Sequence, residues 1–457
     1  MKLTVFQSDK GDCVLVSTNG SDGPFNMLVD GGMSDSYTQH VSPTLNEMQK
    51  NEEKLNLVYV SHIDQDHISG ILQLFEDMMR WRVFDFQKGA NGVKAKEPES
   101  LRPPDVEAIW HNAFHEQIGE NSGAIEDMLA ASAAILSGAE SPGTLQMAAE
   151  HQDLVTSKAE AIQLSRRVGP NQLKIPLNEQ FNHELMCIKE GMPSLIELGG
   201  LKIRIIGPFT EDLDKLRDEW NEWLAKSQKQ IKSIQSKARE DEKSLLGTEA
   251  GQLRDLAETQ ADELREMLSA PTTGIESSGK RLGRRKLVTT PNLASLMLFV
   301  EEGDKTLLLT GDGHAQDILR GLEHHGVLDQ NDGQNLHVNV LKVQHHGSEH
   351  NIDEEFCRRI TADNYIFCGN GEHENPDLDV VKAILNSRLG DDADTLSPNT
   401  QVKDKFTFWF NSSESETAKE GAKAHMRELR ELVESRVEAG RFEANFLEGE
   451  SFFTLEV

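Results

Sequence analysis

Paired cysteines are absent from the sequence. The four cysteines (Cys13, Cys187, Cys357 and Cys368) are scattered along 457 residues, and no two of them form a CxxC pair. This pattern indicates neither a disulfide framework nor a zinc site built from sulfur ligands. It suits a reducing compartment, so we expect a cytoplasmic protein.

Positive charge and long apolar runs are also scarce. The chain has 47 Lys+Arg against 77 Asp+Glu, a formal net charge of −30. Broad binding to DNA or to an anionic membrane is therefore not expected, although the net charge does not exclude a local basic groove. No stretch approaches the roughly 20 apolar residues of a membrane-spanning helix. The N-terminus is interrupted by Asp9, Lys10 and Asp12 before an apolar signal segment can form, so no signal peptide or membrane association is predicted.

Short apolar segments separated by turns predict strands along most of the chain. The clearest are KLTVFQ, CVLVST, NMLVDGG, LNLVYVSH, LKIRIIGPF, TLLLTGDG, HVNVLKVQ, NYIFCGN, FTFWFN and SFFTLEV. ISGILQLFEDMMRW has helical apolar spacing. The order of strand, polar loop and helix occurs twice, which predicts an α/β (α+β) protein with two sheets faced by helices.

Two helical stretches are predicted to be insertions. One covers about residues 120–170, and the other is a charged helical hairpin with a basic loop at 211–285. We therefore expect residues 1–210 to form the first half of the fold, and 286–457 to form the second half with a C-terminal strand-helix-strand extension. The hairpin is either a solvated excursion, or a lid or an arm that binds a protein partner.

The segment SHIDQDH (residues 61–67) concentrates metal-binding side chains at the end of a buried strand. It contains His62, Asp64, Asp66 and His67. Imidazole and carboxylate together suit zinc, manganese or iron, and one tight loop can reach two adjacent ions. Burying two carboxylates without cations would be costly. Further candidate ligands follow later strands: Asp312 in LLLTGDG, and His345 and His346 in VLKVQHHGS.

These motifs, HxDxDH followed by TGD and LKVxHHGS, resemble the metallo-β-lactamase superfamily, and within it the ComEC-like stand-alone metal-hydrolase domains. Further similar segments are Gly11-Asp12, VDGG, IWHN, IPLNEQF and NLASL. The resemblance implies an αββα sandwich with helical insertions and a metal site at one edge of the sheets. It also implies that Asp312 bridges two metal ions, and that one of the two adjacent histidines is the last ligand.

The chain departs from the family pattern at two places. Asp64 stands where the superfamily usually has a second histidine, and Gly207-Pro208 follows a strand that should carry a third-motif histidine. A centre with fewer nitrogen ligands than a typical two-zinc site favours manganese or magnesium over zinc. Alternatively, it binds one ion tightly and a second ion weakly. His111 in IWHN is either a compensating ligand or a local hydrogen-bonding residue near the pocket.

Other residues receive supporting roles. Asp66 is the candidate to orient or deprotonate a water, as its counterpart does in the family. Lys342 either points toward the site to meet a phosphate or faces solvent. Asp30 in VDGG is expected to orient a ligand histidine. Ser348 and His373 are expected to line the substrate pocket.

The predicted function is a metal-dependent hydrolase using one or two divalent ions, most readily a phosphodiesterase or nuclease. The basic cluster Lys280, Arg281, Arg284, Arg285 and Lys286 either guides a nucleic-acid backbone or balances nearby acid. Two alternatives stay open. One is hydrolysis of a carboxylic ester, lactone or thioester on the same centre, and the other is a partner-regulated component of a larger, for example defence, assembly.

Overall fold

The computed structural model describes residues 1–20, 23–89, 96–112, 163–165, 167–215, 217–218, 282–285, 288, 290–329, 335–398, 405–438 and 440–457. Both predicted helical insertions lie largely outside these ranges, so they stay predictions. Among the described residues, no helix has the length and apolar character needed to span a membrane.

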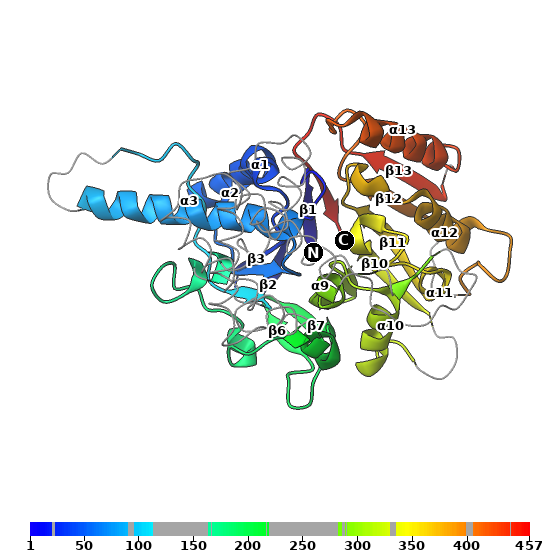
Figure 1. Cartoon of the computed structure of the whole chain (residues 1–457), viewed down its shortest axis with the longest axis horizontal. Helices are drawn as coiled ribbons and strands as arrows, with labels where there is room; N and C mark the ends of the chain where they lie inside the picture. The colour runs from blue at the N-terminus through cyan, green and yellow to red at the C-terminus, as the bar shows by residue number, and fades with distance from the viewer. Residues whose placement is uncertain are drawn as a thin grey trace, which may run out of the picture.

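The first of two mixed sheets has six strands in the order β14-β1-β2-β3-β4-β5 (Figure 1). They are β1 (Lys2–Phe6), β2 (Val14–Gly20), β3 (Gly23–Val29), β4 (Leu57–Val60), β5 (Ile109–His111) and β14 (Phe452–Glu456). The strands from β14 to β3 pair antiparallel, whereas β3, β4 and β5 pair parallel. The parallel strands therefore end at the same edge of this sheet.

The second sheet has eight strands in the order β13-β12-β11-β10-β9-β8-β7-β6. They are β6 (Ile196–Leu198), β7 (Leu201–Gly207), β8 (Met297–Glu302), β9 (Lys305–Leu309), β10 (Leu336–Lys342), β11 (Ile360–Phe367), β12 (Phe406–Phe410) and β13 (Phe442–Phe446). β6 to β9 pair antiparallel, and β9 to β13 pair parallel. β9 and β10 thus end side by side, as β3 and β4 do.

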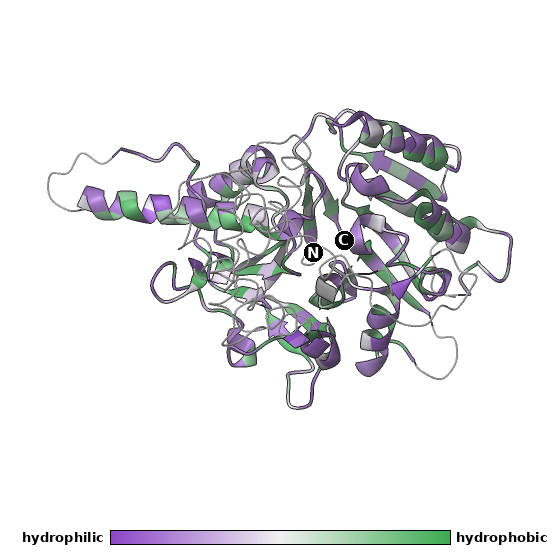
Figure 2. Ribbon diagram, viewed as in Figure 1, coloured by the Kyte–Doolittle hydropathy of each residue, from purple (hydrophilic) through white to green (hydrophobic). Residues whose placement is uncertain are grey.

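Helices lie beside each sheet. α1 (Ser34–Ser36), η1 (Tyr37–Val41), α2 (Ser42–Lys50) and α3 (Gln65–Gly89) accompany the first sheet, and α10 (Ala315–His324), α11 (Glu354–Arg359), α12 (Leu378–Leu389) and α13 (Glu420–Glu434) accompany the second (Figure 1). Shorter helices are η3 (Glu179–Phe181), α9 (Thr290–Leu293), η5 (Gln344–Gly347) and η6 (Glu372–Glu374). Hydrophilic and apolar residues alternate along α3 and α13 (Figure 2), as expected where one helix face packs on a sheet.

The buried apolar side chains form three clusters. One combines side chains from both sheets. A second joins the first sheet to α2 and α3, and a third joins the other sheet to α10–α13. The sequence of β4, LVYV, is apolar throughout because both faces of this strand are buried. Leu57 and Tyr59 belong to the cluster between the two sheets, and Val58 and Val60 belong to the cluster between the first sheet and its helices. A strand buried on both faces needs a continuous apolar run.

The predicted mixed α/β architecture with two sheets and several helices is confirmed. The two sheets do not divide the chain at a single point. β6 and β7, from residues 1–210, belong to the second sheet, and β14, the last strand, pairs with β1 of the first. Each sheet therefore combines strands from residues 1–210 with strands from residues 286–457.

Candidate metal centre

Loops that follow three buried strands bring the candidate ligands together. β4 ends at Val60, and His62 and Asp64 follow it before α3 begins. His67 lies in the first turn of α3. Asp312 follows β9, and η5, which contains the two adjacent histidines, follows β10. Because these strands end near one another, residues far apart in the sequence meet at one place.

His62, His67 and Asp312 form a compact group, here called the centre group. The Nε2 atom of His62 lies 3.6 Å from Asp312 Oδ2, and Nε2 of His67 lies 3.5 Å from Asp312 Oδ1. Asp64 Oδ2 lies 3.6 Å from the same His62 nitrogen. All three members are buried, and among the described residues His62 Nε2, His67 Nε2 and Asp312 Oδ1 have no hydrogen-bond partner. Buried polar atoms normally have partners, so three that converge could hold a metal ion.

Asp30 fixes the orientation of both histidines of this group. Its Oδ2 accepts hydrogen bonds from His67 Nδ1 at 2.9 Å and from Ser61 Oγ at 2.7 Å, and its Oδ1 accepts one from Ser61 N at 2.7 Å. Ser61 Oγ also lies 3.1 Å from His62 Nδ1. With Nδ1 bound to oxygen, each ring presents Nε2 to a cation. The role predicted for Asp30, which is to orient a ligand histidine, requires this geometry.

The first turn of α3 packs closely on the VDGG loop. Gly31 N donates to His67 O at 2.8 Å, and Gly70 N donates to Gly32 O at 2.9 Å. A Cβ at Gly70 would lie only 1.9 Å from Gly31 O. Glycine at position 70 is therefore required for the backbone approach that places His67 beside Asp30.

The Asp312 carboxylate also faces the two adjacent histidines. Its Oδ2 lies 3.5 Å from His345 Nε2 and 3.8 Å from His346 Nε2. Both histidines have positive φ angles, 46° and 55°, a strained conformation that often occurs at functional sites. Asp312 thus lies next to four histidine rings. The resemblance implies one ligand from the pair His345 and His346, but both of these residues present Nε2 to Asp312.

Two asparagines hold His345. Asn351 Oδ1 accepts a hydrogen bond from His345 Nδ1 at 2.7 Å, and Asn351 Nδ2 donates to Asp312 O at 2.7 Å. Asn292 Nδ2 lies 3.3 Å from His345 Nε2. Asn351 therefore links a candidate ligand to the loop that carries Asp312. Neither asparagine was predicted from the sequence to hold a candidate ligand.

His346 joins Asp66 to the centre. His346 Nε2 lies 3.1 Å from Asp66 Oδ2, while its Nδ1 donates to the backbone oxygen of Cys368 at 2.6 Å. Asp66 Oδ2 is also 4.0 Å from His67 Nε2. All seven residues predicted to bind metal therefore lie around the centre group.

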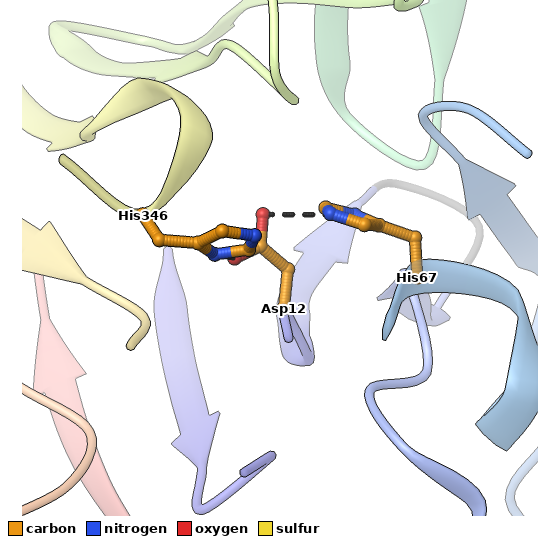
Figure 3. A group of neighbouring side chains, drawn as sticks. All are labelled: Asp12, His67 and His346. Atoms are coloured by element: carbon orange, nitrogen blue, oxygen red, sulfur yellow. Dashed lines mark ion pairs between the residues drawn. The ribbon is translucent and has the colours of Figure 1, made fainter. Parts of the chain in front are cut away.

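Asp12, His67 and His346 form a second group, here called the Asp12 group (Figure 3). Asp12 Oδ1 lies 3.2 Å from His346 Nδ1, and Asp12 Oδ2 lies 3.8 Å from His67 Nδ1. The sequence analysis notes Gly11-Asp12 only as a similar segment. An acidic residue directly before the apolar run CVLV was the signal that could have indicated a buried, paired carboxylate.

Lys342 supplies the positive charge of the Asp12 group. Its ammonium group pairs with Asp12, donates to Gly311 O at 3.3 Å and lies 4.0 Å from Asp312 Oδ1. Lys342 is only 3% exposed, and it is not among the described residues that line the adjacent cavity. It is therefore not a solvent-facing strand residue, and its contact with a phosphate stays a prediction.

The two groups differ in what they offer a metal ion. In the Asp12 group, Lys342 already neutralises the carboxylate, and Nδ1 of each histidine is bonded to oxygen. In the centre group, two imidazole nitrogens and one carboxylate oxygen have no hydrogen-bond partner among the described residues, whereas in the Asp12 group only Asp12 Oδ1 of the facing atoms lacks one. Such donors are typical of zinc and manganese sites. The centre group therefore fits an ion better than the Asp12 group does.

The electrostatics of the centre favour positive charge. Burial alone would lower the pKa of His67, but the surrounding carboxylates, Asp312 first and then Asp30, raise it well above its usual value. Burial would raise the pKa of Asp312, but His345, His67 and other nearby histidines hold it well below its usual value. A cation would interact with the same carboxylates, so protons and metal ions compete for this site.

A cavity of about 490 Å³ adjoins the centre. Five candidate ligands line it, namely Asp64, Asp66, Asp312, His345 and His346. The other lining residues are Lys10, Ser348, Glu349, His350, Gly369, Asn370, Glu372, His373, Glu374, Asn375 and Asp377. Ser348 and His373, which the sequence predicts at the substrate side, are thus both at this cavity.

His111 lies beside the strand that leads to His62. It ends β5 and is paired with Val60 of β4. It is 1% exposed, and burial lowers its pKa to about 4. It belongs to neither described group that could hold a metal ion and does not line the cavity. Among the described residues, neither ring nitrogen of His111 has a hydrogen-bond partner, so the choice between the two alternatives for His111 stays a prediction.

Arg285, from the predicted basic cluster, pairs with two buried acids. Its Nη2 donates to Asp212 Oδ1 at 3.0 Å and its Nε donates to Asp317 Oδ2 at 3.0 Å. Burial and the neighbouring Asp317 raise the pKa of Asp212 to about 6, despite the guanidinium group. Arg285 therefore balances nearby acid. Lys280, Arg281 and Lys286 lie outside the described residues.

In comparisons with models of protein families and with curated proteins, nothing matches this chain. The resemblance to the metallo-β-lactamase superfamily therefore stays a prediction from sequence motifs. What supports a metal centre is the convergence of buried histidine and carboxylate atoms.

Proposed function

We propose that the protein is a metal-dependent hydrolase of the metallo-β-lactamase type that cleaves a phosphodiester. The observation that carries the proposal is the centre group, whose buried, unpartnered atoms converge next to a polar cavity. The αββα arrangement implied by the resemblance is part of this proposal. It is compatible with the two mixed sheets and with the apolar cluster that they share.

His62, His67 and Asp312 would hold a divalent ion, with Asp64, Asp66, His345 and His346 as further donors to it or to a second ion. When bound, such an ion supplies an acidic water, whose pKa falls from about 15.7 toward about 7. Zinc and manganese match the mixed nitrogen and oxygen donors, and magnesium is the alternative if oxygen donors dominate.

Asp66 is suited to orient the attacking water and to accept its proton. Its carboxylate lines the cavity. Burial would raise the pKa of Asp66, but His67 and His346 lower it below its usual value, which keeps the carboxylate ionised. In the hydrolysis, the water oxygen bonds to phosphorus, the bond from phosphorus to the leaving oxygen breaks, and the leaving oxygen takes up a proton.

The cavity lining argues against the carboxylic ester, lactone or thioester alternative. An apolar cavity would favour such substrates. The described lining residues include seven carboxylates, four histidines and one lysine, with no aliphatic or aromatic hydrocarbon side chain. A polar substrate therefore fits better.

The test combines metal analysis with cleavage of bis-p-nitrophenyl phosphate in the presence of manganese or zinc. We expect wild type to retain metal and to cleave the diester. Asp312→Ala should lose both properties, whereas Asp66→Ala should retain metal and lose about 10²- to 10⁴-fold in kcat. Asp379→Asn, which removes an exposed carboxylate on α12, should behave as wild type.

Each contrary result has a distinct meaning. Metal binding without phosphodiester cleavage by wild type would favour the ester alternative. A wild-type protein that retains no metal with any supplement would refute the metal centre itself.

A further inference from the structure

Asn292 lies in α9, and the residues that follow α9 contact two of the loops that carry candidate ligands. Leu296 N donates to Ser61 O at 2.8 Å, in the loop after β4. Asp312 N donates to Ser295 Oγ at 3.2 Å, in the loop after β9. Ser295 N in turn donates to Asn292 O at 3.0 Å. These contacts fix the backbone of Asn292 beside the metal centre.

The carboxamide group of Asn292 is directed into this centre. Asn292 is 3% exposed, and its Nδ2 lies 3.3 Å from His345 Nε2. The same His345 nitrogen lies 3.5 Å from Asp312 Oδ2, and this oxygen lies 3.6 Å from His62 Nε2. The side chains of His62, His345 and Asn292 therefore meet on one side of the Asp312 carboxylate.

The oxygen of the Asn292 carboxamide has no partner. Among the described residues, Asn292 Oδ1 is buried and accepts no hydrogen bond. His62 Nε2, on the same side of Asp312, is also buried without a partner in this part of the chain. Buried side-chain oxygens and nitrogens are normally satisfied. A divalent cation would satisfy both of these atoms, because each offers a lone pair.

Hydrogen bonding decides which end of the carboxamide can face His345 when an ion is bound. His345 Nδ1 donates to Asn351 Oδ1 at 2.7 Å, so Nε2 is the ring nitrogen that has the lone pair. This single lone pair cannot accept a hydrogen bond from Asn292 Nδ2 and bind an ion at the same time. Rotation of the carboxamide by about 180° exchanges its two ends, which brings Oδ1 to the position of Nδ2.

A carboxamide oxygen also suits the charge of this side of the centre. Two carboxylates are already present, because Asp64 Oδ2 and Asp312 Oδ2 each lie 3.6 Å from His62 Nε2. A neutral oxygen adds a ligand without adding further negative charge. Carbonyl and carboxylate oxygens are preferred by manganese and magnesium, whereas imidazole suits zinc. An oxygen from Asn292 would therefore shift the preference of this site toward manganese.

We propose that Asn292 is a metal ligand, which binds through Oδ1 the ion held by His62, His345 and Asp312. The presence of an ion rests on the proposed function. The assignment of Asn292 rests on its buried, unpartnered oxygen and on its position beside His345.

The affinity for manganese, measured by competition with a chromophoric chelator, tests the inference. Asn292→Ala removes the oxygen and should weaken binding by about tenfold or more. Asn292→Asp has nearly the same shape and keeps an oxygen at this position, so it should bind manganese at least as tightly as wild type. Asn182→Asp, which makes the same change at an exposed position after η3, is the matched control and should leave the affinity unchanged.

Asn292→Asp separates a ligand from a residue that only supports a ligand. A carboxylate cannot donate a hydrogen bond to His345 Nε2. If Asn292 acts only as a donor, Asn292→Asp should therefore bind manganese more weakly than wild type, and this result would overturn the inference. Unchanged affinity in Asn292→Ala would overturn it as well. Circular dichroism checks that each variant is folded, and Asn292→Asp alone decides the question if Asn292→Ala does not fold.

The visible absorption spectrum of the cobalt-loaded protein provides a second measurement, because the d–d bands depend on the atoms bound to cobalt. Both Asn292 variants should shift these bands, whereas Asn182→Asp should not. Bands identical to those of wild type in both Asn292 variants would overturn the inference.

The result is independent of the hydrolysis. A protein with these affinities and spectra that cleaves no phosphodiester would refute the proposed reaction and leave Asn292 as a ligand. A protein that cleaves the diester and keeps wild-type affinity in Asn292→Ala would keep the reaction and overturn the ligand.

Discussion

Replacing Lys342 by methionine tests whether its buried ammonium group organises the Asp12 group. Methionine keeps a similar side-chain length and removes the charge. Lys342 is 3% exposed and Asp12 is 2% exposed, so water does not replace the lost partner. Removing one member of a buried ion pair typically costs about 3–5 kcal/mol.

The pKa of Asp12 indicates where in this range the effect should fall. Burial alone would raise this pKa, but Lys342, followed by His346 and His67, lowers it to about 2. The two histidines stay in Lys342→Met and continue to oppose the cost of burial. We therefore expect the free energy of unfolding to fall by about 3 kcal/mol, at the lower end of the range. Asp12→Asn added to this variant should recover part of the loss, because it removes the uncompensated charge.

Urea unfolding followed by circular dichroism, with a chelator present throughout, measures these differences without a contribution from metal. Lys305→Met, on β9 and only partly buried, is the matched control and should change stability by less than about 0.5 kcal/mol. The reasoning is refuted if Lys342→Met costs less than about 1 kcal/mol. It is also refuted if the double variant is no more stable than Lys342→Met alone.

Three further predictions concern other parts of the structure. The pKa of Asp212 is about 6 in the folded protein and about 3.9 in an unfolded chain. Asp212 therefore keeps its proton to a higher pH in the folded protein than in the unfolded chain. Stability should therefore fall by up to roughly 3 kcal/mol as pH rises from about 4 to 6, and Asp212→Asn should remove this fall in urea unfolding across that range. Asn351→Ala removes the oxygen that binds His345 Nδ1 and should weaken metal affinity about 10- to 100-fold in chelator competition; unchanged affinity would contradict the role. Gly70→Ala should destabilise the protein by about 1–3 kcal/mol and lower its metal content, whereas Gly89→Ala, with open space around it in the same helix, should be neutral in thermal unfolding and retain metal.

The strands and the candidate ligands were predictable because both leave local traces in the sequence. A strand buried on both faces, such as β4, requires consecutive apolar residues, and the polar residues that directly follow it belong to the loop at the sheet edge. His62 and Asp64 lie in one such loop, and Asp66 and His67 follow directly in the first turn of α3. Their joint position was therefore visible without tertiary information.

The parts that were not predicted depend on contacts between distant segments. The pairing of Asp12 with Lys342 joins residues 330 positions apart, and neither residue alone indicates a buried partner. Likewise, β13 alternates apolar and polar residues over only five positions, with Phe442 alone fully buried, so this short edge strand is recognised through its pairing with β12. The assignment of β7 to the second sheet follows from its pairing with β8, across a long intervening stretch of sequence.

The placement of positive charge near the site leads to a last prediction. Lys342 and Arg285 are both held in ion pairs with buried acids, so neither is free to neutralise a substrate phosphate. Among the described residues, this leaves Lys10 as the one lysine or arginine lining the cavity, against seven carboxylates. Recognition of a phosphodiester anion should therefore depend on bound divalent ions.

Calorimetry with diethyl phosphate, a phosphodiester anion, measures this dependence. We expect saturable binding to the manganese- or zinc-loaded protein and no detectable binding to the chelator-treated protein, because seven carboxylates repel the anion when no ion offsets them. Higher salt should reduce the repulsion without creating a site. Equal binding with and without metal would show that side chains alone recognise the phosphate. In that case, the inference that bound divalent ions supply the positive charge of the phosphate site would be wrong.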